Sequence, residues 1–359
     1  MKILVSTGGQ GTKMWPYSRE SKPKQFQPII GDKSSYQQTI ETLLKKFSPE
    51  DIYISTKHKF IKYISEQSPM IPLRNYIIEP NISLNRGPGE GLAFLHLSIN
   101  HSGEPFFYVQ ADILRDPEEG FLQMIDEAEE LVTKHKKLIT GGIKATEPTM
   151  GIDYLRLGDR DSNAREAYAI DEFLPRKKTL KATRELIGDY HVVTHSNHTC
   201  WYPELMMDAY KKYRPDWHKA LMKIKDVLGE TNETEKIEAI YKTMKAGPTE
   251  EVTDNVMNSG GAMVVLLPYR WRDIGTWNSV FNFYAGNGEN YTDGNAVIID
   301  TIGTLVKTDQ KDKLIAVVGA DDLVIVDTED ALLVSSKERL EKLSEVHKTL
   351  KDENKKQYL

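Results

Sequence analysis

Ile3-Leu4-Val5-Ser6 is followed by Thr7-Gly8-Gly9-Gln10-Gly11-Thr12-Lys13, so a short apolar run stops at a glycine-rich loop. A buried parallel strand typically ends in this way. Glycine lets backbone amides approach phosphate oxygens closely and adopts positive φ without strain. The loop matches neither common phosphate motif, because the dinucleotide fingerprint needs glycine where Met14 stands and the P-loop needs it where Lys13 stands. Taken alone, the loop is either a tight turn or a phosphate cradle.

The following segments alternate between strand-like and helix-like patterns. Helical patterning over 36–47 and 92–99 separates apolar runs, which predicts β-α-β units with right-handed crossovers and a parallel sheet. The predicted strands are 3–6, 51–55, 76–78 and 106–109. These features place the chain in the α/β class.

A change in composition marks a second domain. Residues 286–294 are rich in Gly, Asn and Asp, which are typical of turns and linkers. Three short β-type runs follow, at 296–299, 314–318 and 323–326. In 335–355 one amphipathic helix face is formed by Leu340, Leu343, Val346 and Leu350. We therefore predict two domains, 1–285 and 286–359, the second a small β domain ending in a helix.

The composition of the 359 residues excludes several classes of protein. An integral membrane protein is excluded, because the chain has no apolar stretch approaching the roughly 20 residues that span a bilayer. The 47 Lys and Arg against 53 Asp and Glu leave a net charge of -6, which gives no field to attract nucleic acid. Cys200 is the single cysteine and cannot form an internal disulfide, and the N-terminal apolar run is too short for a signal peptide. We expect a cytoplasmic protein.

Four cationic residues follow the glycine-rich loop: Lys13, Arg19, Lys22 and Lys24. They would suit a triphosphate, because arginine offers a bidentate fork and lysine a point charge. The alternative is a solvated surface loop. Two prolines and a tryptophan within 13–26 favour an ordered, packed loop, the kind that often carries function.

Two aspartates from distant segments are candidate metal ligands. Asp112 follows the predicted strand 106–109, and Asp273 lies in the motif 271–277, Trp-Arg-Asp-Ile-Gly-Thr-Trp. Mg²⁺ is typically held by one or two carboxylates together with substrate phosphates. An aspartate after a strand can equally be a turn residue, so the sequence leaves their convergence open. Glu79 likewise either contacts a base edge or lies in a turn.

Residues 191–200 contain borderline metal ligands at close spacing: His191, His195, His198 and Cys200. If the segment is one strand, the first two face one side and the last two the other, so they cannot chelate one ion. We expect no zinc site here, and a position beside a binding cleft for one or two of these residues.

Taken in order, these segments resemble the mannose-1-phosphate guanylyltransferase family of sugar nucleotidylyltransferases along nearly the whole chain. The family sequences GGxGTRLWPLSR, PKQF, EP, RNTAP, PADH and WxDxGxW correspond to residues 8–19, 23–26, 79–80, 84–88, 110–113 and 271–277. Residues 318–334 resemble the small C-terminal β domain of the family. The opening loop together with PKQF is the most specific part of the match.

The resemblance implies a Rossmann-like nucleotidyltransferase core with a mixed, mostly parallel sheet. It also implies the reaction of GTP with mannose-1-phosphate or a related sugar-1-phosphate, in which a sugar-phosphate oxygen attacks the α-phosphorus and pyrophosphate leaves. This step needs positioning and charge neutralisation more than covalent chemistry. A homodimer is compatible with the resemblance.

The resemblance also implies site residues. The catalytic set is Lys13, Arg19 and Lys24, and the Mg²⁺ ligands are Asp112 and Asp273. The nucleotide contacts are Gly8, Gly9, Gly11, Thr12, Glu79, Asn85 and Ala111. The sugar contacts are Gly151, Arg176, Asn197 and His198.

Departures from the family concentrate in the sugar half. Where the family has FVEKP this chain has Phe-Leu-Pro-Arg-Lys at 173–177, so Pro175 replaces a carboxylate expected to bind sugar hydroxyls. WNSGMF is Ser-Asn-His-Thr-Cys-Trp at 196–201, and a further family glutamate is Asn258. Lys13 replaces the loop arginine and loses its bidentate fork. These losses predict a sugar other than mannose or a weakened enzyme.

Two other functions are alternatives. A non-catalytic paralogue that binds a sugar nucleotide and regulates a partner would fit the altered sugar residues, but a pure binder has little need of Asp112, Asp273 and Lys24. A Rossmann dehydrogenase would need a third glycine that the loop lacks. Release of pyrophosphate on addition of a sugar-1-phosphate distinguishes the enzyme from the regulatory paralogue.

Overall fold

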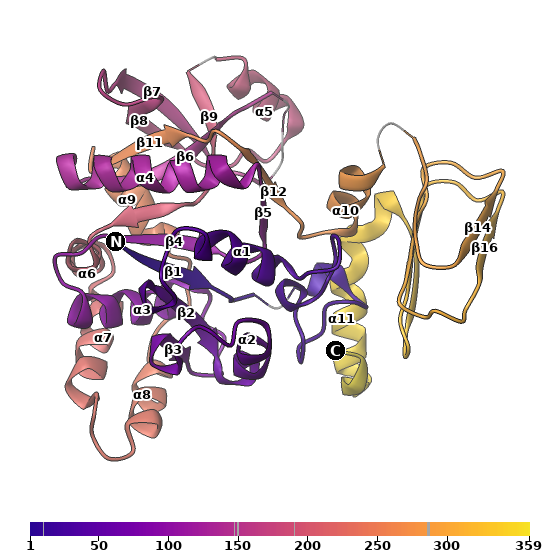
Figure 1. The fold of residues 1–359 in the computed structure, drawn as a ribbon, viewed down its shortest axis with the longest axis horizontal. Helices are drawn as coiled ribbons and strands as arrows, with labels where there is room; N and C mark the ends of the chain where they lie inside the picture. The colour runs from indigo at the N-terminus through magenta and orange to yellow at the C-terminus, as the bar shows by residue number, and fades with distance from the viewer. Residues whose placement is uncertain (10, 147, 149–150, 190, 286–287) are drawn as a thin grey trace. The chain divides into compact units, whose positions relative to one another are not determined.

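The first strand, β1 (Lys2–Ser6), is covered on both faces, and its residues Ile3, Leu4 and Val5 are fully buried. We describe the fold from a computed structural model, which describes residues 1–9, 11–146, 148, 151–189, 191–285 and 288–359 (Figure 1). β1 pairs in parallel with β2 (Ile52–Lys57) and β4 (Phe106–Gln110), and β2 pairs in parallel with β3 (Tyr76–Glu79). The four predicted strands at the start of the chain are thus confirmed.

The rest of the main sheet is largely antiparallel. Within the described residues the strand order is β11-β8-β7-β9-β6-β10-β4-β1-β2-β3. The added strands are β6 (Leu138–Lys144), β7 (Tyr154–Arg160), β8 (Ala167–Leu174), β9 (Val192–His195), β10 (Thr199–Trp201) and β11 (Ala262–Leu266). Of these, β6 and β11 pair in parallel. The following pairs are antiparallel: β10–β4, β10–β6, β11–β8, β6–β9, β7–β8 and β7–β9.

The sheet is mixed, as expected, but the expectation that it is mostly parallel is wrong for the strands after β4. The reason lies in the connections. Each parallel pair needs a long crossover, whereas antiparallel neighbours such as β7 and β8 need only a short turn. The β-α-β pattern that predicts parallel pairing lies in the first part of the chain.

Helices cover both faces of this sheet. On β4 the ring of Phe106 lies 5.0 Å from Phe94 of α3, and the ring of Phe107 lies 6.3 Å from Phe121 of α4. Consecutive strand residues point to opposite faces, so α3 and α4 lie on opposite sides of the sheet. The helices are α2 (Ile61–Gln67), α3 (Arg86–Asn100), α4 (Glu118–His135), α5 (Leu180–Ile187), α6 (Pro203–Tyr213), α7 (Pro215–Val227), α8 (Glu233–Tyr241) and α9 (Glu250–Asn258). None of the helices within the described ranges combines the length and apolar character needed to cross a membrane.

The chain divides into two compact units. The first unit comprises residues 1–8, 42–110 and 115–271 and holds the main sheet, and the second comprises 9–41, 111–114 and 272–359. α1 (Ser35–Leu44), β5 (Ile113–Asp116) and β12 (Arg270–Asp273) contain residues of both, and β5 pairs with β12. The glycine-rich loop therefore belongs largely to the same unit as the C-terminal segment. The domain boundary at 285/286 stays a prediction, and residues 286 and 287 lie outside the described residues.

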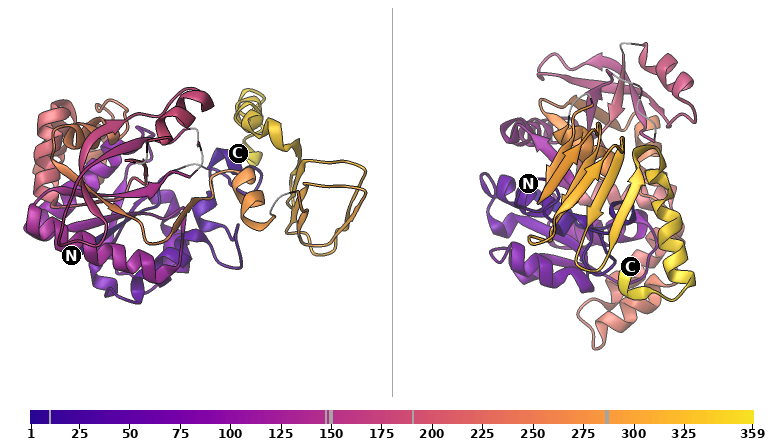
Figure 2. Two further views of the ribbon diagram at one scale, coloured as in Figure 1. Left: turned by 90° about the horizontal axis from the view of Figure 1, so that it is seen from above. Right: turned by 90° about the vertical axis from the view of Figure 1, so that its right-hand side faces the viewer.

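The C-terminal strands of the second unit wind into a coil. β13, β15 and β17 pair in parallel in one sheet and β14 and β16 in another, so the chain alternates between two sheets, as in a β-helix (Figure 2). β18 pairs antiparallel with β17. The elements are α10 (Trp277–Tyr284), β13 (Tyr291–Asp293), β14 (Ala296–Ile299), β15 (Leu305–Thr308), β16 (Ile315–Val318), β17 (Leu323–Asp327), β18 (Leu332–Ser336) and α11 (Leu343–Asp352). The predicted β domain with a terminal helix is confirmed.

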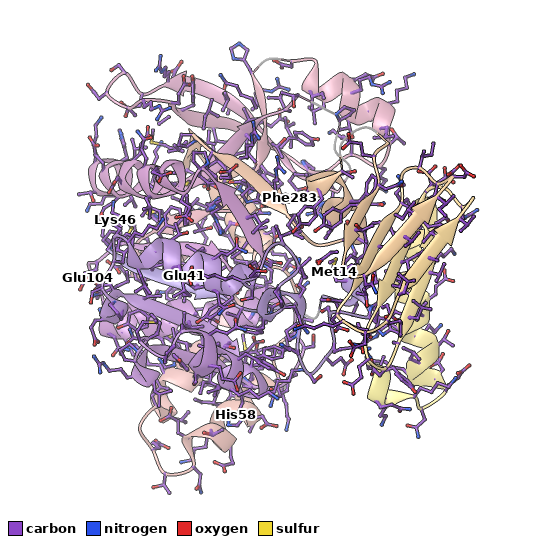
Figure 3. The ribbon with its side chains drawn as sticks, turned by 45° about the vertical axis from the view of Figure 1, so that its right-hand side comes forward. Met14, Glu41, Lys46, His58, Glu104 and Phe283 are labelled. Atoms are coloured by element: carbon purple, nitrogen blue, oxygen red, sulfur yellow. The ribbon has the colours of Figure 1, made fainter. Side chains whose placement is uncertain are left out.

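The second unit has a core of its own. Met14, labelled in Figure 3, is fully buried and belongs to the same apolar cluster as Trp277, Leu340 and Leu343. The indole of Trp277 donates to the carbonyl oxygen of Trp15 at 2.9 Å, and that of Trp15 donates to the carbonyl oxygen of Tyr358 at 2.8 Å. Met14 and Trp15 are thus packed within the second unit, as the prolines and tryptophan of 13–26 predict.

Candidate active site

Gly11 of the glycine-rich loop packs closely against Ser18 and Lys24. Gly11 has a φ of 60° and precedes a short 3-10 helix, Thr12–Met14. A Cβ atom at Gly11 would lie 2.4 Å from Ser18 Oγ and 3.1 Å from Lys24 Cγ. Ser18 Oγ in turn accepts a hydrogen bond from the Lys24 backbone amide at 3.0 Å. Glycine is required here both for its backbone conformation and for the close packing.

We expect Gly11→Ala to lower the free energy of unfolding by about 1–3 kcal/mol, because it adds a strained backbone and a steric clash. Denaturant unfolding measures this change. Gly8→Ala is the control: its φ lies outside the left-handed region and an added Cβ meets nothing closer than 3.7 Å. Equal destabilisation by both substitutions would contradict the role given to Gly11.

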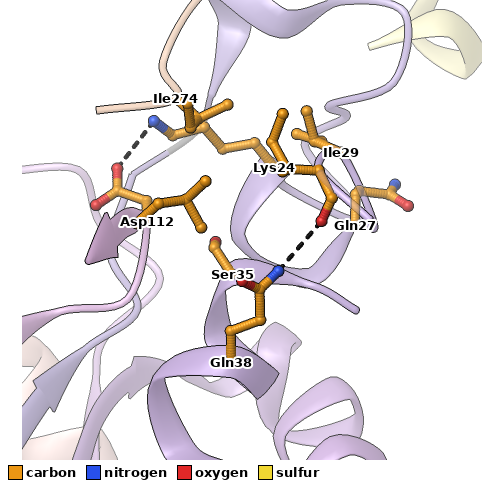
Figure 4. Close-up of a pocket in the computed structure, with 9 residues that line it drawn as sticks. Lys24, Gln27, Ile29, Ser35, Gln38, Asp112 and Ile274 are labelled. Atoms are coloured by element: carbon orange, nitrogen blue, oxygen red, sulfur yellow. Dashed lines mark hydrogen bonds and ion pairs between the residues drawn. The ribbon is translucent and has the colours of Figure 1, made fainter. Parts of the chain in front are cut away.

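Lys24, Asp112 and Asp273 meet in the second unit. Lys24 Nζ lies 2.9 Å from Asp112 Oδ2 and 3.3 Å from Asp273 Oδ1. Figure 4 shows the Lys24 side chain reaching to the Asp112 carboxylate. Only 11% of the Lys24 side chain is exposed. The two aspartates, whose convergence the sequence leaves open, are thus close enough to share one cation.

The electrostatics of this centre keep Lys24 charged. Burial alone would lower the pKa of Lys24, but the carboxylates of Asp112 and Asp273 outweigh burial and the pKa is raised. The ammonium group therefore offsets one of the two negative charges of the carboxylates. It also supplies a fixed positive charge where a phosphate group could bind.

The residues at this centre suit a hard divalent cation. Within the described residues, three or more His, Cys, Asp or Glu side chains nowhere form a group that could hold a metal ion. Two carboxylates completed by substrate phosphates and water are, however, the usual ligand set of Mg²⁺. Asp112 and Asp273 fit that set. Lys24 would balance part of their negative charge before a cation binds.

A small cavity opens beside Lys24 and Asp112 (Figure 4). Its walls are completed by Gln27, Ile29, Ile30, Ser35, Gln38, Leu114 and Ile274. Gln38 Nε2 donates to the Ile30 carbonyl oxygen at 3.2 Å, which fixes one wall. The ion-paired side chains therefore border an accessible space.

The other predicted residues of the second unit differ in their surroundings. Lys13 is exposed, and Ala111 is buried directly before Asp112. Arg19 is 12% exposed; its Nε donates to the Pro16 carbonyl oxygen and its Nη2 pairs with Asp330, each at 2.6 Å. The arginine thus holds loop residues in this structure, and its catalytic role stays a prediction.

In the first unit, Glu79 and Asn85 lie at the end of β3 and the start of α3. Glu79 accepts a hydrogen bond from the Tyr241 hydroxyl at 2.8 Å, and burial raises the pKa of its carboxyl group. A Cβ atom at Gly89 of α3 would lie 2.8 Å from that carboxyl carbon. Asn85 caps α3 by accepting from the Arg86 amide at 2.8 Å. Their contacts to a nucleotide stay predictions.

The predicted sugar residues are spread over the turns of the first unit. Gly151 is exposed, and Asn197 has a φ of 57° in the turn between β9 and β10. Arg176 forms a bidentate ion pair with Asp153, with N–O distances of 3.1 and 2.6 Å. His198 is 3% exposed, and its ring nitrogens contact Ser196 Oγ at 2.8 Å and the Tyr269 hydroxyl at 3.1 Å. Both nitrogens of His198 are therefore engaged within the fold, so its contact with a sugar stays a prediction.

Residues 191–200 contribute to two strands and a turn rather than to a single strand. β9 ends at His195 and β10 begins at Thr199. The Cys200 thiol contacts the Ala128 carbonyl oxygen at 3.7 Å, and burial raises its pKa. The Cys200 sulfur is therefore engaged within the fold.

Sequence reasoning missed a cluster of charged residues on α9. Glu250 Oε1 accepts from Arg86 at 3.2 Å, and Asp254 Oδ1 is buried without a hydrogen-bond partner among the described residues. The pKa of Asp254 is raised to about 7, first by burial and then by the charges of Glu250 and Asp153, whereas Arg176 and Arg86 oppose the shift. One signal could have found it: Asp254 lies four residues before Asn258, hence on the same helix face.

Asp254→Asn should stabilise the protein at high pH. The folded-state pKa of about 7 lies above the ordinary value of 3.8, so ionising Asp254 costs stability. The wild type therefore loses stability relative to the variant as the pH rises from about 4 to about 7. We expect the Tm of the variant to exceed that of the wild type at pH 8 and the difference to shrink towards pH 4.

Asp226→Asn is the control for this variant, because Asp226 is exposed on α7. Its Tm should differ from that of the wild type by the same small amount at both pH values. A Tm difference for Asp254→Asn that does not change with pH would contradict the shifted pKa.

Comparison with known proteins gives a consistent assignment. The nucleotidyl transferase family model matches residues 2–290, and the model of the MannoseP isomerase/GMP-like beta-helix domain matches residues 294–350. The mannose-1-phosphate guanylyltransferase of Escherichia coli is 29% identical over 369 residues, covering 99% of this chain and 75% of that protein. The alginate biosynthesis protein AlgA of Pseudomonas aeruginosa is 26% identical over 351 residues, covering 97% and 71%.

A solved structure supports the fold assignment. The protein from Thermus thermophilus described as a mannose-1-phosphate geranyltransferase superposes with a TM-score of 0.84 at 22% identity, covering 98% of this chain and 99% of that one. The resemblance in the sequence motifs is therefore confirmed over both parts of the chain. This chain belongs to the nucleotidyl transferase family, as a member of its sugar-1-phosphate nucleotidylyltransferases with a C-terminal beta-helix domain.

Proposed function

We propose that this chain transfers the guanylyl group of GTP to a sugar-1-phosphate and releases pyrophosphate, using Mg²⁺. The observation that carries the proposal is the meeting of Lys24, Asp112 and Asp273 beside the glycine-rich loop. A purely sugar-binding protein has no need of two carboxylates that share one lysine. The guanylyltransferase names of the relatives supply the choice of GTP.

The proposed roles follow from the chemistry of the step. An ionised oxygen of the sugar-1-phosphate attacks the α-phosphorus of GTP, the bond from that phosphorus to the bridging oxygen breaks, and pyrophosphate carries away the electron pair. Asp112 and Asp273 would hold Mg²⁺, whose charge stabilises the phosphate oxygens. Lys24 would add a second positive charge, and the amides of Gly9 and Gly11 would orient the triphosphate. The attacking phosphate is already ionised at neutral pH, so the step needs positioning more than proton transfer.

The sugar is mannose or a related sugar. The mannose-1-phosphate names of relatives favour mannose. Pro175 and Asn258, where the resemblance predicts carboxylates, favour a different pattern of hydroxyl contacts. Homodimer formation and the cytoplasmic location stay predictions.

The proposal is tested by pyrophosphate release with GTP, ATP, UTP, CTP and dTTP, each combined with mannose-, glucose-, fucose- and heptose-1-phosphate and Mg²⁺. We expect release with GTP and one of these sugars, and loss of release when EDTA removes the metal. Measurable nucleotide binding without release in any combination would refute the enzyme and favour the regulatory paralogue. Release with a different nucleotide would refute the choice of GTP.

A further inference from the structure

Three buried hydrogen-bond acceptors lack a partner in one part of the first unit. They are Asp254 Oδ1, Glu250 Oε2 and His195 Nδ1, and the statement holds for the residues that the structure describes. The charges of Asp153, Glu250, Arg86 and Arg176 act on Asp254, and those of Asp153 and Arg86 act on His195. Asp254 and His195 thus share the charged neighbours Asp153 and Arg86, and Glu250 is a neighbour of Asp254. These residues, with Arg176, are called the α9 cluster below.

The cations of this cluster are already paired. Arg176 holds Asp153 through both carboxylate oxygens. Arg86 donates from Nε to Glu90 at 2.9 Å and from Nη1 to Glu250 Oε1 at 3.2 Å. The second oxygen of Glu250 and Oδ1 of Asp254 are left as acceptors. Buried acceptors are costly when they lack donors, so a ligand that brings hydrogen-bond donors would satisfy them.

The tautomer of His195 adds a third acceptor. The side chain is 5% exposed, and burial lowers its pKa to about 4, so the ring is neutral at neutral pH. The Thr140 hydroxyl donates its single proton to the His198 carbonyl oxygen at 2.6 Å. Its oxygen, 2.9 Å from His195 Nε2, must then accept, so Nε2 carries the ring proton. Nδ1 is therefore a bare acceptor, and the His195 amide donates to the Asp153 carbonyl oxygen at 2.8 Å, which places this residue beside Asp153.

Two members of the cluster lie near the positions, 175 and 258, at which this chain lacks the carboxylates of the mannose-1-phosphate guanylyltransferase family. Arg176 directly follows Pro175, and Asn258 lies one helical turn after Asp254 on α9. Asn258 Oδ1 is occupied by the Phe173 amide at 3.3 Å, so it supports β8. Asp254, on the same helix face, keeps its oxygen unpartnered among the residues described.

We infer that Asp254 and Glu250 are specificity-determining residues that accept hydrogen bonds from the hydroxyl groups of the bound sugar, with His195 as a neutral third acceptor. The inference rests on the proposed function, because it assigns the sugar side of the same reaction. The carboxylates that bind the sugar would then be those of Glu250 and Asp254, in the turns of α9 before Asn258, and not side chains at positions 175 and 258. A polyhydroxylated neutral sugar supplies the donors that this cluster lacks.

Calorimetric binding of GDP-mannose, GDP-glucose and GDP-fucose, each compared with GDP, tests the inference without requiring turnover. We expect the wild type to bind at least one GDP-sugar more tightly than GDP. Asp254→Asn and Glu250→Gln should each lower the affinity for that GDP-sugar by about 10-fold or more. Each should change the affinity for GDP by less than about 2-fold. Glu238→Gln, an exposed residue of α8 paired with Lys242, is the control and should match the wild type.

The outcomes separate this inference from the proposed function. A wild type that binds every GDP-sugar no better than GDP would overturn the inference, as would variants that keep the preference for the sugar nucleotide. Parallel loss of GDP and GDP-sugar affinity would also overturn it, because that pattern indicates a structural role. Pyrophosphate release tests the transfer reaction separately, so a selective sugar effect without turnover would support the inference and refute the proposed enzyme.

Discussion

Asp112→Asn should lower the rate of pyrophosphate release by about 1000-fold or more while the protein stays folded. Asp112 Oδ2 lies 2.9 Å from Lys24 Nζ, in the centre shared with Asp273. Asparagine keeps the size of the side chain but removes the charge that a divalent cation needs. Initial rates at saturating GTP and increasing Mg²⁺ measure the effect, and the Mg²⁺ concentration needed for half-maximal activity should rise.

Asp32→Asn is the matched control for this variant. Asp32 is an exposed residue of the same unit, and its substitution should leave both the rate and the Mg²⁺ dependence within about 2-fold of the wild type. A melting temperature within a few degrees of the wild type would show that Asp112→Asn is folded. Near-normal Mg²⁺-dependent activity of that variant would remove Asp112 from the metal site.

Lys24→Met should reduce turnover by about 100-fold or more, because it removes the positive charge expected to act on the reacting phosphates. It should also change how Mg²⁺ affects stability. In the wild type the ammonium group competes with a cation for Asp112 and Asp273. In the variant the two carboxylates are left without that partner, so Mg²⁺ should bind more tightly and raise the melting temperature more than in the wild type.

Lys33→Met is the control for charge removal at the surface. Lys33 is 55% exposed and pairs with Glu41 in the same unit. It should leave both turnover and the Mg²⁺ effect on melting unchanged. If Lys24→Met lost activity but gained no response to Mg²⁺, Lys24 would not be the counter-charge of a cation site.

The start of the fold could be predicted because its signals are local. The apolar run before the glycine-rich loop determines β1, and the alternation that follows determines β2 to β4. The short β-type runs after residue 294 likewise predict the last strands. Each of these signals lies within about a dozen residues, the range over which hydrophobic periodicity reports secondary structure.

The reaction centre could be predicted only as a set of candidates. Asp112 and Asp273 follow different strands, and their separation in sequence says nothing about their distance in space. The resemblance placed both near a metal, and the structure adds that Lys24 joins them through two ion pairs. Arg19 has the right charge for a phosphate, yet its guanidinium is held by Pro16 and Asp330, a contact 311 residues away in sequence.

The α9 cluster was not predicted, because the spacing of Asp254 from Asn258 is an ambiguous signal. Glu250 and Asp254 look like the solvated face of a helix, and four-residue spacing is common on such faces. Their charged neighbours Arg86 and Arg176 come from other parts of the chain. The antiparallel half of the sheet was missed for a related reason, since strand direction depends on pairings between distant segments.

Whether Lys24, Asp112 and Asp273 form one reaction centre is tested most directly by anomalous X-ray diffraction from crystals grown with Mn²⁺ and a GDP-sugar. The expected result is a single Mn²⁺ peak bound by the carboxylates of Asp112 and Asp273, with Lys24 Nζ within hydrogen-bond distance of a phosphate oxygen. A Mn²⁺ ion bound elsewhere, with Lys24 still paired to both aspartates, would contradict the assignment of this centre.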